Sequence, residues 1–331
     1  MTEVLYLSSE DVAELAEPAE YVAAVREGYR DRGTGAPAEP RTTLAADGGM
    51  LTSYLAILPE VGYMGGYTYA AGFEAADAWF VTPLFDAAAG ELLALIDGAA
   101  MNPFKTGAAG AVAVDALARE DATVLGVIGA GTQARGQIRA TVTVRSFDRV
   151  LLYSPTRERR EGTAADLDGT IASSVDAVDD VEAVIGEADV LVTATTASEP
   201  VFGGERLAPG SHVTAMGQYH PDRREVDTAT VARSRYVPDL RARIHTDAGA
   251  FIRAREDGAI TDEHVHAELG EVVAGRTPGR TDAEQITLFD SGGTAIETVA
   301  AAGMLYERAV AAGRGTTIEL SPASEAFLGR P

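Results

Sequence analysis

The spacing of apolar residues changes along this chain, and each pattern predicts a different kind of structure. At the start, EVLYL (3–7) has the composition of a short strand. Ser8 follows it, with Glu10 and Asp11 close behind, which is typical of a helix whose first residue is capped and whose first turn is acidic. A second helix is expected over residues 18–32.

Short apolar runs broken by glycine occupy residues 50–98, and examples are LTSYLAIL (51–58) and AWFVTPLFD (78–86). Asp-Ala-Ala-Ala-Gly at 86–90 has the residues of a hairpin turn between two such runs. The region therefore predicts an antiparallel sheet. The small apolar residues that follow it, at 104–118, predict a helix.

From residue 123 onwards, apolar strands alternate with helices. The pattern predicts strands at 123–129, 149–154, 189–196 and 212–217, and helices at 157–167 and 294–313. Alternation of this length is typical of a doubly wound parallel sheet, so we expect an α/β fold that contains a Rossmann domain. At 331 residues the chain is long for one core, and two domains are expected.

The charge balance excludes two classes of partner. Fifty acidic and 27 basic residues give a net charge of −23, the wrong sign for electrostatic binding to nucleic acid or to an anionic membrane. Hydrophobic residues still make up 46 % of the chain, enough to bury a core. We interpret the acidic surface as an adaptation to high salt and expect a halophilic cytoplasm as its location. An acidic protein from an ordinary cytoplasm is the alternative.

Several kinds of site are not expected from the composition. The chain has no cysteine, which excludes disulfides and thiolate metal sites. The histidines lack metal-ligand spacing, so no metal is expected. The first residues do not resemble a secretory signal, and no apolar stretch reaches the roughly 18 residues of a membrane-spanning helix.

The clearest chemical signal is VLGVIGAGTQA, in which Gly129, Gly131 and Ala134 form G-x-G-x-x-A after an apolar strand and before a helix. The first glycine permits a tight turn, and the second lets backbone N–H groups approach a pyrophosphate. The alanine allows the helix to pack closely on the strand, and the helix N-terminus attracts negative charge. Because strand, turn and helix all agree, the motif predicts a dinucleotide site.

The residues after the second strand favour one dinucleotide. An NAD site needs an acid at the carboxyl end of that strand, but Asp148 precedes it. The carboxyl end carries Ser154, followed by Thr156 and Arg157 in an arginine-rich run, and these residue types suit a 2′-phosphate better than a bare diol. We therefore predict that NADP(H) is preferred over NAD(H). A solvated helix start with ordinary charge pairs is the alternative.

Lys105, in MNPFKTGAA (101–109), is the only lysine in the chain, since every other basic residue is arginine. If Lys105 were a chance surface residue, we would expect lysines at other surface positions as well, and there are none. We interpret this single ammonium as a functional group.

Several segments together resemble the ornithine cyclodeaminase/mu-crystallin family. They are VLYLSSEDV (4–12), Pro40-Arg41, PLFDAAAGELLALIDG (83–98), VLGVIGAGTQA (124–134), ADVLVTATTASEPVF (188–202), MGQYHPDRREVD (216–227), HAELGEVVAGRTPGR (266–280) and FDSGGTAIETVAAAGMLYERA (289–309). The resemblance implies a homodimer in which a Rossmann domain is inserted into a discontinuous substrate and dimerisation domain. It predicts that residues 1–117 and 305–331 form the substrate domain and that 118–304 form the Rossmann domain.

The resemblance also implies site residues. Arg41 and Lys105 are expected to bind a substrate carboxylate, with Lys105 in place of the family's usual arginine. Tyr67 stands where the family has a lysine that serves in binding and proton transfer, and Tyr219 stands where cyclodeaminases have an aspartate. Tyr67, Tyr219 and His220, together with Lys105, are therefore the catalytic candidates. The cofactor contacts are expected at Thr82, Thr106, Gly129, Ala130, Gly131, Thr132, Gln133, Ala134, Ser154, Thr156, Arg157, Thr195, Met216, Gly217 and Ser291.

Three functions remain open at this point. The first is an NAD(P)-dependent reductase of small α-imino acids or cyclic ketimine carboxylates, or an amino-acid dehydrogenase in the reverse direction. The second is an ornithine cyclodeaminase-type lyase, which the missing aspartate disfavours. The third is a non-catalytic NADPH-binding protein of the crystallin kind.

Overall fold

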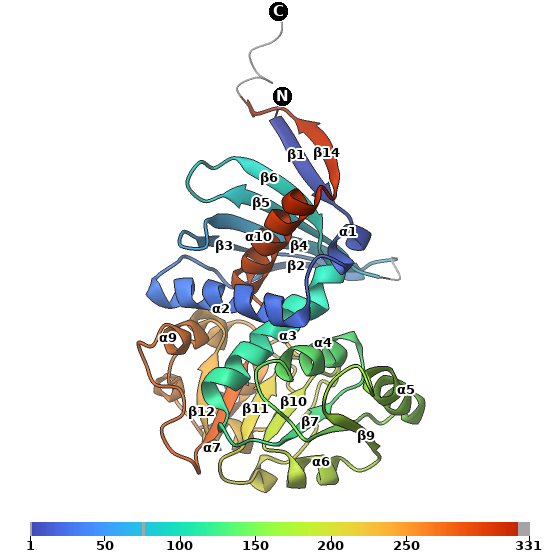
Figure 1. Cartoon of the computed structure of the whole chain (residues 1–331). Helices are drawn as coiled ribbons and strands as arrows, with labels where there is room; N and C mark the ends of the chain where they lie inside the picture. The colour runs from blue at the N-terminus through green and yellow to red at the C-terminus, as the bar shows by residue number, and fades with distance from the viewer. Residues whose placement is uncertain (1, 75–76, 324–331) are drawn as a thin grey trace, which may run out of the picture.

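The computed structural model describes residues 2–74 and 77–323, which form two seven-stranded sheets connected by long helices (Figure 1). The first is a mixed sheet with the order β14-β1-β6-β5-β4-β3-β2. Its neighbours are antiparallel except β1 and β6, which run parallel. Its strands are β1 (Thr2–Leu7), β2 (Thr42–Ala46), β3 (Gly49–Leu58), β4 (Tyr63–Gly72), β5 (Trp79–Asp86), β6 (Leu92–Asp97) and β14 (Thr316–Leu320).

Local signals explain the parts of this sheet that the sequence predicted. The hairpin turn between β5 and β6 is confirmed: Asp86 Oδ1 accepts from the N–H groups of Ala88 and Ala89, and Gly90 takes a positive φ of 74°. The predicted capped helix start after β1 is also confirmed, because Ser8 and Asp11 form a reciprocal capping box.

Four helices belong to the mixed sheet: α1 (Ser9–Ala13), α2 (Pro18–Thr34), α3 (Gly98–Leu117) and α10 (Ala295–Ala312). In Figure 1, α10 crosses the sheet and α2 and α3 lie between the two sheets. The sequence placed the start of α3 at residue 104, which is wrong by six residues. The helix begins after Asp97, whose side chain accepts from the Ala99 N–H, and it continues through Pro103.

The second sheet is parallel throughout, with the order β12-β13-β11-β10-β7-β8-β9. The predicted α/β fold class with a doubly wound parallel sheet is confirmed. Its strands are β7 (Val124–Ile128), β8 (Arg149–Tyr153), β9 (Ser174–Val178), β10 (Val190–Thr193), β11 (His212–Ala215), β12 (Ser234–Pro238) and β13 (Ile286–Asp290). Side chains of successive residues point to opposite faces of the sheet, and both faces are buried. Val127 therefore packs in one hydrophobic cluster and Ile128 in another.

Short helices connect these strands. They are α4 (Thr132–Thr141), α5 (Arg157–Leu167), α6 (Val181–Glu187), α7 (Thr228–Arg233), α8 (Gly249–Glu256) and α9 (Leu269–Val273), with single 3₁₀ turns η1 (Gly204–Arg206), η2 (Arg241–His245) and η3 (Asp262–His264). Strands β7 and β10 are neighbours in this sheet, and the chain continues to one side from β7 and to the other side from β10. In open parallel sheets, ligands bind in the crevice at such a reversal of strand order.

Two connections join the sheets. Helix α3 packs on α4 so closely that a Cβ on Gly107 would lie 2.3 Å from the Gly136 carbonyl oxygen. The other connection is the short segment from Ser291 to Thr294, between β13 and α10. The predicted domain limit at residue 117 coincides with the end of α3, whereas the predicted limit at 304/305 falls inside α10. Because α10 packs on β3, β4 and β5, we propose a limit between β13 and α10 instead.

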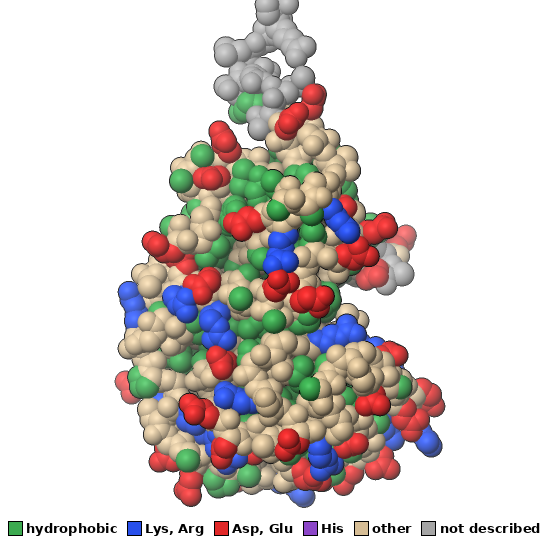
Figure 2. All heavy atoms as spheres, in the orientation of Figure 1, with side chains coloured by type: hydrophobic (Ala, Val, Ile, Leu, Met, Phe, Trp, Pro, Cys, Tyr) green, Lys and Arg blue, Asp and Glu red, His purple; other side chains and the backbone are tan. Residues whose placement is uncertain are grey.

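Figure 2 shows acidic side chains scattered over one face with arginines between them, and a notch between the part with the mixed sheet and the part with the parallel sheet. Within residues 2–74 and 77–323, no helix combines the length and the apolar character that a membrane crossing requires.

One buried histidine predicts how stability depends on pH. His212 lies fully buried between the hydroxyls of Thr287 and Thr214, and burial, followed by the charge of Arg280, lowers its pKa to about 3. Between about pH 6.5 and pH 3, the unfolded chain binds a proton at this residue and the folded chain does not. We expect the free energy of unfolding to fall by roughly 5 kcal/mol across this interval because of this residue alone.

The measurement is urea unfolding at several pH values for the wild type and for His212→Asn, whose side chain is neutral throughout. The variant should lose less stability than the wild type between pH 6.5 and pH 3, whatever its stability at neutral pH. His245→Asn is the control, because that side chain is half exposed. Equal pH slopes for the wild type and His212→Asn would contradict the prediction.

Candidate active site

A cavity of about 400 Å³ lies where the two sheets face each other, at the carboxyl ends of β10 and β11. It brings together eleven residues that the sequence singled out: Arg41, Tyr67, Lys105, Thr106, Gly131, Thr132, Gln133, Thr195, Met216, Gly217 and Tyr219. A larger groove, of about 680 Å³, runs along α2 and α10 and shares no lining residue with this cavity. We take the smaller cavity as the candidate active site, because it alone of the two contains the glycine motif.

The turn between β7 and α4 has the geometry that a pyrophosphate needs. Gly129 has a φ of 126°, and a Cβ there would lie 2.3 Å from the Ala194 carbonyl oxygen, so only glycine fits. Gly131 is the N-cap of α4, and a Cβ there would meet no atom within 4 Å. Ala134 is fully buried against the strands. The open space over Gly131, at the N-terminus of a ten-residue helix, fits a phosphate group.

Other predicted cofactor residues lie around this turn. Thr106 and Thr195 line the cavity, and the Ala130 carbonyl accepts a bond from Thr163 on α5. Three of the predicted cofactor residues have a buried polar atom without a hydrogen-bond partner in the described structure: Gln133 Oε1, Thr82 Oγ1 and Ser291 Oγ. Gln133 lines the cavity, whereas Thr82 and Ser291 do not. An unpaired acceptor at the wall suits a ligand that carries a donor, such as an amide.

The residues predicted for the 2′-phosphate follow β8. Ser154 is buried, and its carbonyl accepts from Arg160 Nη1 at 3.0 Å. Thr156 is the N-cap of α5, and the guanidinium of Arg157 is largely exposed, with its Nε 2.7 Å from Glu161 Oε1. Asp148 precedes β8 and bonds to the Thr123 carbonyl, at the far end of the strand from the cavity. None of these side chains lines the cavity itself.

Lys105 is buried in the cavity wall, with a side chain that is 1 % exposed. Its Nζ lies 2.9 Å from Glu297 Oε1 and 4.9 Å from the centre of the Tyr67 ring. Glu297 is fully buried in the first turn of α10, and burial raises its pKa while the charge of Lys105 opposes that rise. Sequence reasoning missed Glu297, although an acid in so apolar a helix, AIETVAAAGML, is the signal that could have found it.

Arg41 also lines the cavity, and its guanidinium is held on several sides. It lies 3.2 Å from Asp247, 3.2 Å from the Tyr69 hydroxyl and 4.0 Å from the centre of the Tyr219 ring. It also donates to the carbonyl groups of Gly292 and Gly293. Arg41 thus contacts both the mixed sheet and the connection between β13 and α10.

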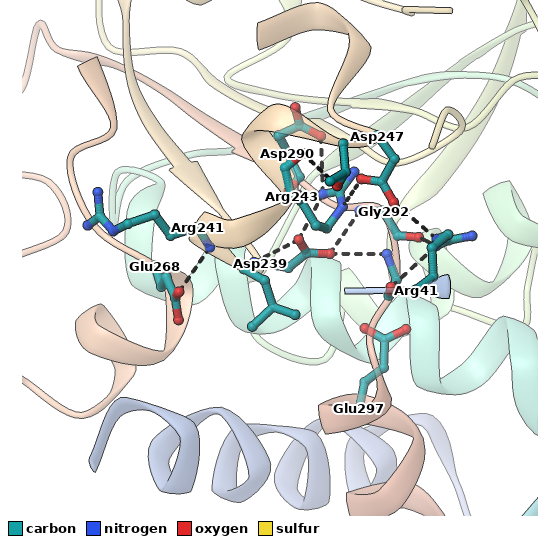
Figure 3. A network of polar contacts seen from close by, with 12 residues as sticks. Arg41, Asp239, Arg241, Arg243, Asp247, Glu268, Asp290, Gly292 and Glu297 are labelled. Atoms are coloured by element: carbon teal, nitrogen blue, oxygen red, sulfur yellow. Dashed lines mark hydrogen bonds and ion pairs between the residues drawn. The ribbon is translucent and has the colours of Figure 1, made fainter. Parts of the chain in front are cut away.

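Figure 3 shows the Gly292 segment between Arg41 on one side and Asp239 and Arg243 on the other. Arg243 is 1 % exposed and pairs with Asp239 at 2.8 Å, Asp247 at 2.6 Å and Asp290 at 3.7 Å. Asp239 Oδ2 in turn accepts from the N–H groups of Gly292 and Gly293. Burial raises the pKa of Asp290, and Arg243 opposes that rise. This buried cluster fixes the segment that carries α10 and Glu297.

Aromatic side chains form the wall beside Lys105. Tyr67 and Phe80 stack with their ring centres 5.2 Å apart, and Tyr54 and Tyr69 pack against Tyr67. Burial raises the pKa of Tyr54, Tyr67 and Tyr69 well above the ordinary phenol value. The Tyr67 hydroxyl lies within hydrogen-bond distance of the Gly98 carbonyl, at 3.4 Å. These phenols are therefore neutral. The hydroxyl of Tyr67, which the sequence suggested as a proton source, points at the Gly98 carbonyl.

The structure separates the neighbouring candidates Tyr219 and His220. Tyr219 lines the cavity beneath Arg41. His220 does not line it: its imidazole is 54 % exposed, and Nδ1 accepts from the Asp222 N–H at 3.1 Å. The expectation that His220 faces the reacting centre does not agree with this placement, because the loop after β11 turns successive side chains in different directions.

Sequence reasoning also missed Glu225, a buried acid that holds the two cavity loops together. Its carboxylate accepts from the Thr193 hydroxyl and from the backbone N–H groups of Thr195 and Gly217. Burial raises the pKa of Glu225, and its hydrogen bonds with Thr193, Thr195 and Gly217 oppose that rise. Among the described residues, no group of three or more His, Asp or Glu is arranged to hold a metal ion.

Comparison with known proteins decides the family. The model of the "Ornithine cyclodeaminase/mu-crystallin family" matches residues 4–313. The chain belongs to this family. That membership confirms the resemblance seen in the sequence.

Three members of the ornithine cyclodeaminase/mu-crystallin family illustrate the similarity. Delta(1)-pyrroline-2-carboxylate reductase from Bacillus cereus is 35 % identical over 240 residues, which are 72 % of this chain and 74 % of the relative. The structure of the Thermococcus litoralis Delta(1)-pyrroline-2-carboxylate reductase in complex with NADH and L-proline has a TM-score of 0.90 at 31 % identity, covering 95 % of this chain and all of that one. An archaeal alanine dehydrogenase dimer with bound NAD also has a TM-score of 0.90 at 31 % identity, covering 97 % and 100 %.

Proposed function

We propose that this chain is an NAD(P)-dependent oxidoreductase that reduces small α-imino acids, with cyclic ketimine carboxylates as the first candidates. The observation that carries the proposal is a single cavity lined by two cations, Arg41 and Lys105, and by the Gly131 turn. The relatives named as pyrroline-2-carboxylate reductases, alanine dehydrogenase and ketimine reductase mu-crystallin confirm the predicted class of enzyme. The reverse reaction, amino-acid dehydrogenation, uses the same site.

Different residues of the cavity would bind the cofactor, orient the substrate and form the apolar wall. A bound nicotinamide would supply the hydride, held at its pyrophosphate by the backbone around Gly131. Arg41 and Lys105 would bind the carboxylate of the imino acid and so orient its C=N bond. The stacked rings of Tyr67 and Phe80 provide a flat apolar wall suited to a planar ring.

The same cavity disfavours the two alternative functions. Its lining contains no Asp or Glu among the described residues, and nearby Glu297 already pairs with Lys105, so the second amine of ornithine would find no free carboxylate. The two cations Arg41 and Lys105 line the same cavity as the Gly131 turn, an arrangement that suits a carboxylate substrate beside the cofactor. These observations support the reductase over the lyase and over the crystallin-like protein.

The test is consumption of reduced cofactor, followed by absorbance, with pyrroline-2-carboxylate, piperideine-2-carboxylate, and pyruvate with ammonia. Reactions are run at low and at molar potassium chloride, because the net charge of −23 supports our proposal of a salt-adapted cytoplasmic enzyme. We expect turnover of at least one cyclic ketimine. Proline formation from ornithine would favour the lyase. Tight cofactor binding without turnover of any substrate would favour the crystallin-like protein.

We also propose that NADP(H) is preferred over NAD(H), through Arg157 and the hydroxyls of Ser154 and Thr156. The bond from Thr163 to the Ala130 carbonyl supports this, because it ties α5 to the glycine turn. Arg157→Glu is expected to raise KM for NADPH about 10-fold or more, the effect of losing one contact to a charged phosphate. KM for NADH should change little. Arg149→Glu, at the opposite end of β8, is the control. Equal effects on both cofactors would contradict the preference.

A homodimer is the assembly we propose. The strands β2, β3 and β5 expose large apolar side chains: Leu44 is 66 % exposed, Leu55 61 % and Trp79 74 %. A monomer rarely leaves such residues gathered on one sheet. The archaeal alanine dehydrogenase is a dimer, which supports the same assembly here.

A further inference from the structure

We propose that Lys105 donates the proton to the imine nitrogen and that Glu297 is the positioning residue that holds its ammonium at the cavity wall. The inference rests on the proposed reductase function and deepens it. Binding of the substrate carboxylate then falls mainly to Arg41.

The other polar groups of the cavity are poor proton donors. Arg41 is permanently charged, and its guanidinium forms an ion pair with Asp247 and hydrogen bonds with Tyr69 and two backbone carbonyls. Burial keeps the phenols of Tyr54, Tyr67 and Tyr69 protonated, and their raised pKa values oppose proton release. His220 lies outside the cavity. Tyr219 also lines the cavity, but its ring lies against the Arg41 guanidinium, 4.0 Å from it. Among the described lining residues, Lys105 is then the remaining group whose N–H can be donated and released to a ligand.

The surroundings of Lys105 leave part of its ammonium available to a ligand. An ammonium carries three N–H donors, and one of them is used by Glu297 at 2.9 Å. The described structure shows no second hydrogen bond from Nζ. Glu297 is fixed from behind, because α10 buries it and Tyr29 of α2 donates to its Oε2 at 3.5 Å. The carboxylate therefore holds one N–H, and the other two are free for a ligand in the cavity.

The charged and titratable groups that face this pair come from several elements. They are Tyr29 from α2, Tyr54 from β3, Tyr67 from β4, Arg41 from the loop before β2 and Asp239 from the loop after β12. The three phenols are neutral, and Arg41 and Asp239 carry opposite charges. Removal of the Glu297 charge therefore leaves Lys105 without its counter-ion.

The step balances without a further reagent. The hydride brings both electrons of the new C–H bond, and the π pair of C=N takes the proton from Lys105 Nζ to form the new N–H bond. The products are the amine, the oxidised nicotinamide and a neutral lysine, which regains a proton from water when the product leaves.

Lys105→Arg separates proton donation from carboxylate binding. Arginine keeps the cation and binds carboxylates well, but it does not release a proton. We expect kcat to fall about 100-fold or more, the usual contribution of a general acid, while KM for the imine changes far less. Lowering the pH should restore much of kcat/KM, because the imine then arrives already protonated. A variant with nearly wild-type kcat would overturn the proposal and leave Lys105 as a carboxylate ligand.

Glu297→Gln tests the positioning role, and the single lysine makes a direct measurement possible. When lysine is isotopically labelled, NMR shows one side-chain amine signal, that of Lys105, and its titration can be followed without substrate. We expect the ammonium to lose its proton at a lower pH in Glu297→Gln than in the wild type, and the fall of kcat at high pH to move in the same direction. Glu307→Gln, on the exposed side of α10, is the control.

The outcomes separate the two levels of the proposal. If the wild type reduces no imine, the proposed function fails. If it reduces imines but the lysine signal and the pH profile are the same in Glu297→Gln and the wild type, the positioning role fails alone. Cofactor binding, measured by fluorescence, should be unchanged in Lys105→Arg, which shows that the variant is folded.

Discussion

Replacement of Arg243 by methionine should lower the free energy of unfolding by about 3–5 kcal/mol. The side chain is fully buried and neutralises Asp239, Asp247 and Asp290. Methionine fills much of the same volume, so the expected loss comes from the three carboxylates that remain buried without their counter-ion. The measurement is urea unfolding at neutral pH and high salt.

Two further observations distinguish this cause from a simple packing defect. The difference in free energy of unfolding between the wild type and Arg243→Met should become smaller as the pH is lowered, because protonated carboxyl groups no longer repel one another. Asp290 should protonate early, since its pKa is already raised. Arg206→Met, in which the lost partner is an exposed Glu182, should change stability much less. An Arg243→Met protein as stable as the Arg206→Met protein would show that the cluster does not hold the fold together.

The Arg243 cluster also connects stability with the site. Asp239 binds the N–H groups of Gly292 and Gly293, and Arg41 binds their carbonyl groups. A Cβ on Gly292 would lie 2.2 Å from the Arg243 guanidinium, so the segment fits between the two arginines only because it has no side chain there. The position of Glu297, a few residues further on, therefore depends on a cluster in the other half of the molecule.

Features set by neighbouring residues were predictable from the sequence. The G-x-G-x-x-A turn, the strands β7 and β8, and helix α5 follow from local spacing and caps, and the structure has them where they were expected. Strand β10 was expected over 189–196 but ends at Thr193. The edge strand β2 was missed because all five of its residues are exposed, and its sequence, TTLAA, has no alternation to detect. Helix α3 was started too late because Pro103 lies within it.

The site was predictable only where composition or family pattern marked a residue. Lys105 stood out as the single lysine, and the structure places it in the cavity wall. Its partner Glu297 is 192 residues away in sequence, and no local rule joins the two. Arg243 is a mixed case: Asp239 and Asp247 are four residues away on either side, whereas Asp290 is 47 residues away in sequence. The orientation of His220 depends on how a loop folds back, which spacing does not determine.

Gly131→Val is expected to weaken binding of NADPH and NADH by about 100-fold or more while the chain still folds. The backbone there has φ −90° and ψ −173°, an extended conformation that valine adopts readily, and no atom of the described protein lies within 4 Å of the new Cβ. The branched side chain would instead occupy the space over the N-terminus of α4, where the pyrophosphate must approach the backbone. Fluorescence titration with each cofactor gives the affinity.

The control is Gly203→Val, because Gly203 is also a helix N-cap with a similar φ of −92° and open space around its Cβ, but lies outside the cavity. Both variants lose at most about 1 kcal/mol of stability from the changed cap. Only Gly131→Val should lose the cofactor, and it should lose NADPH and NADH alike, since the pyrophosphate is common to both. Normal binding by Gly131→Val would mean that the cofactor lies elsewhere, and the roles of Arg41 and Lys105 around a nicotinamide would lose their basis.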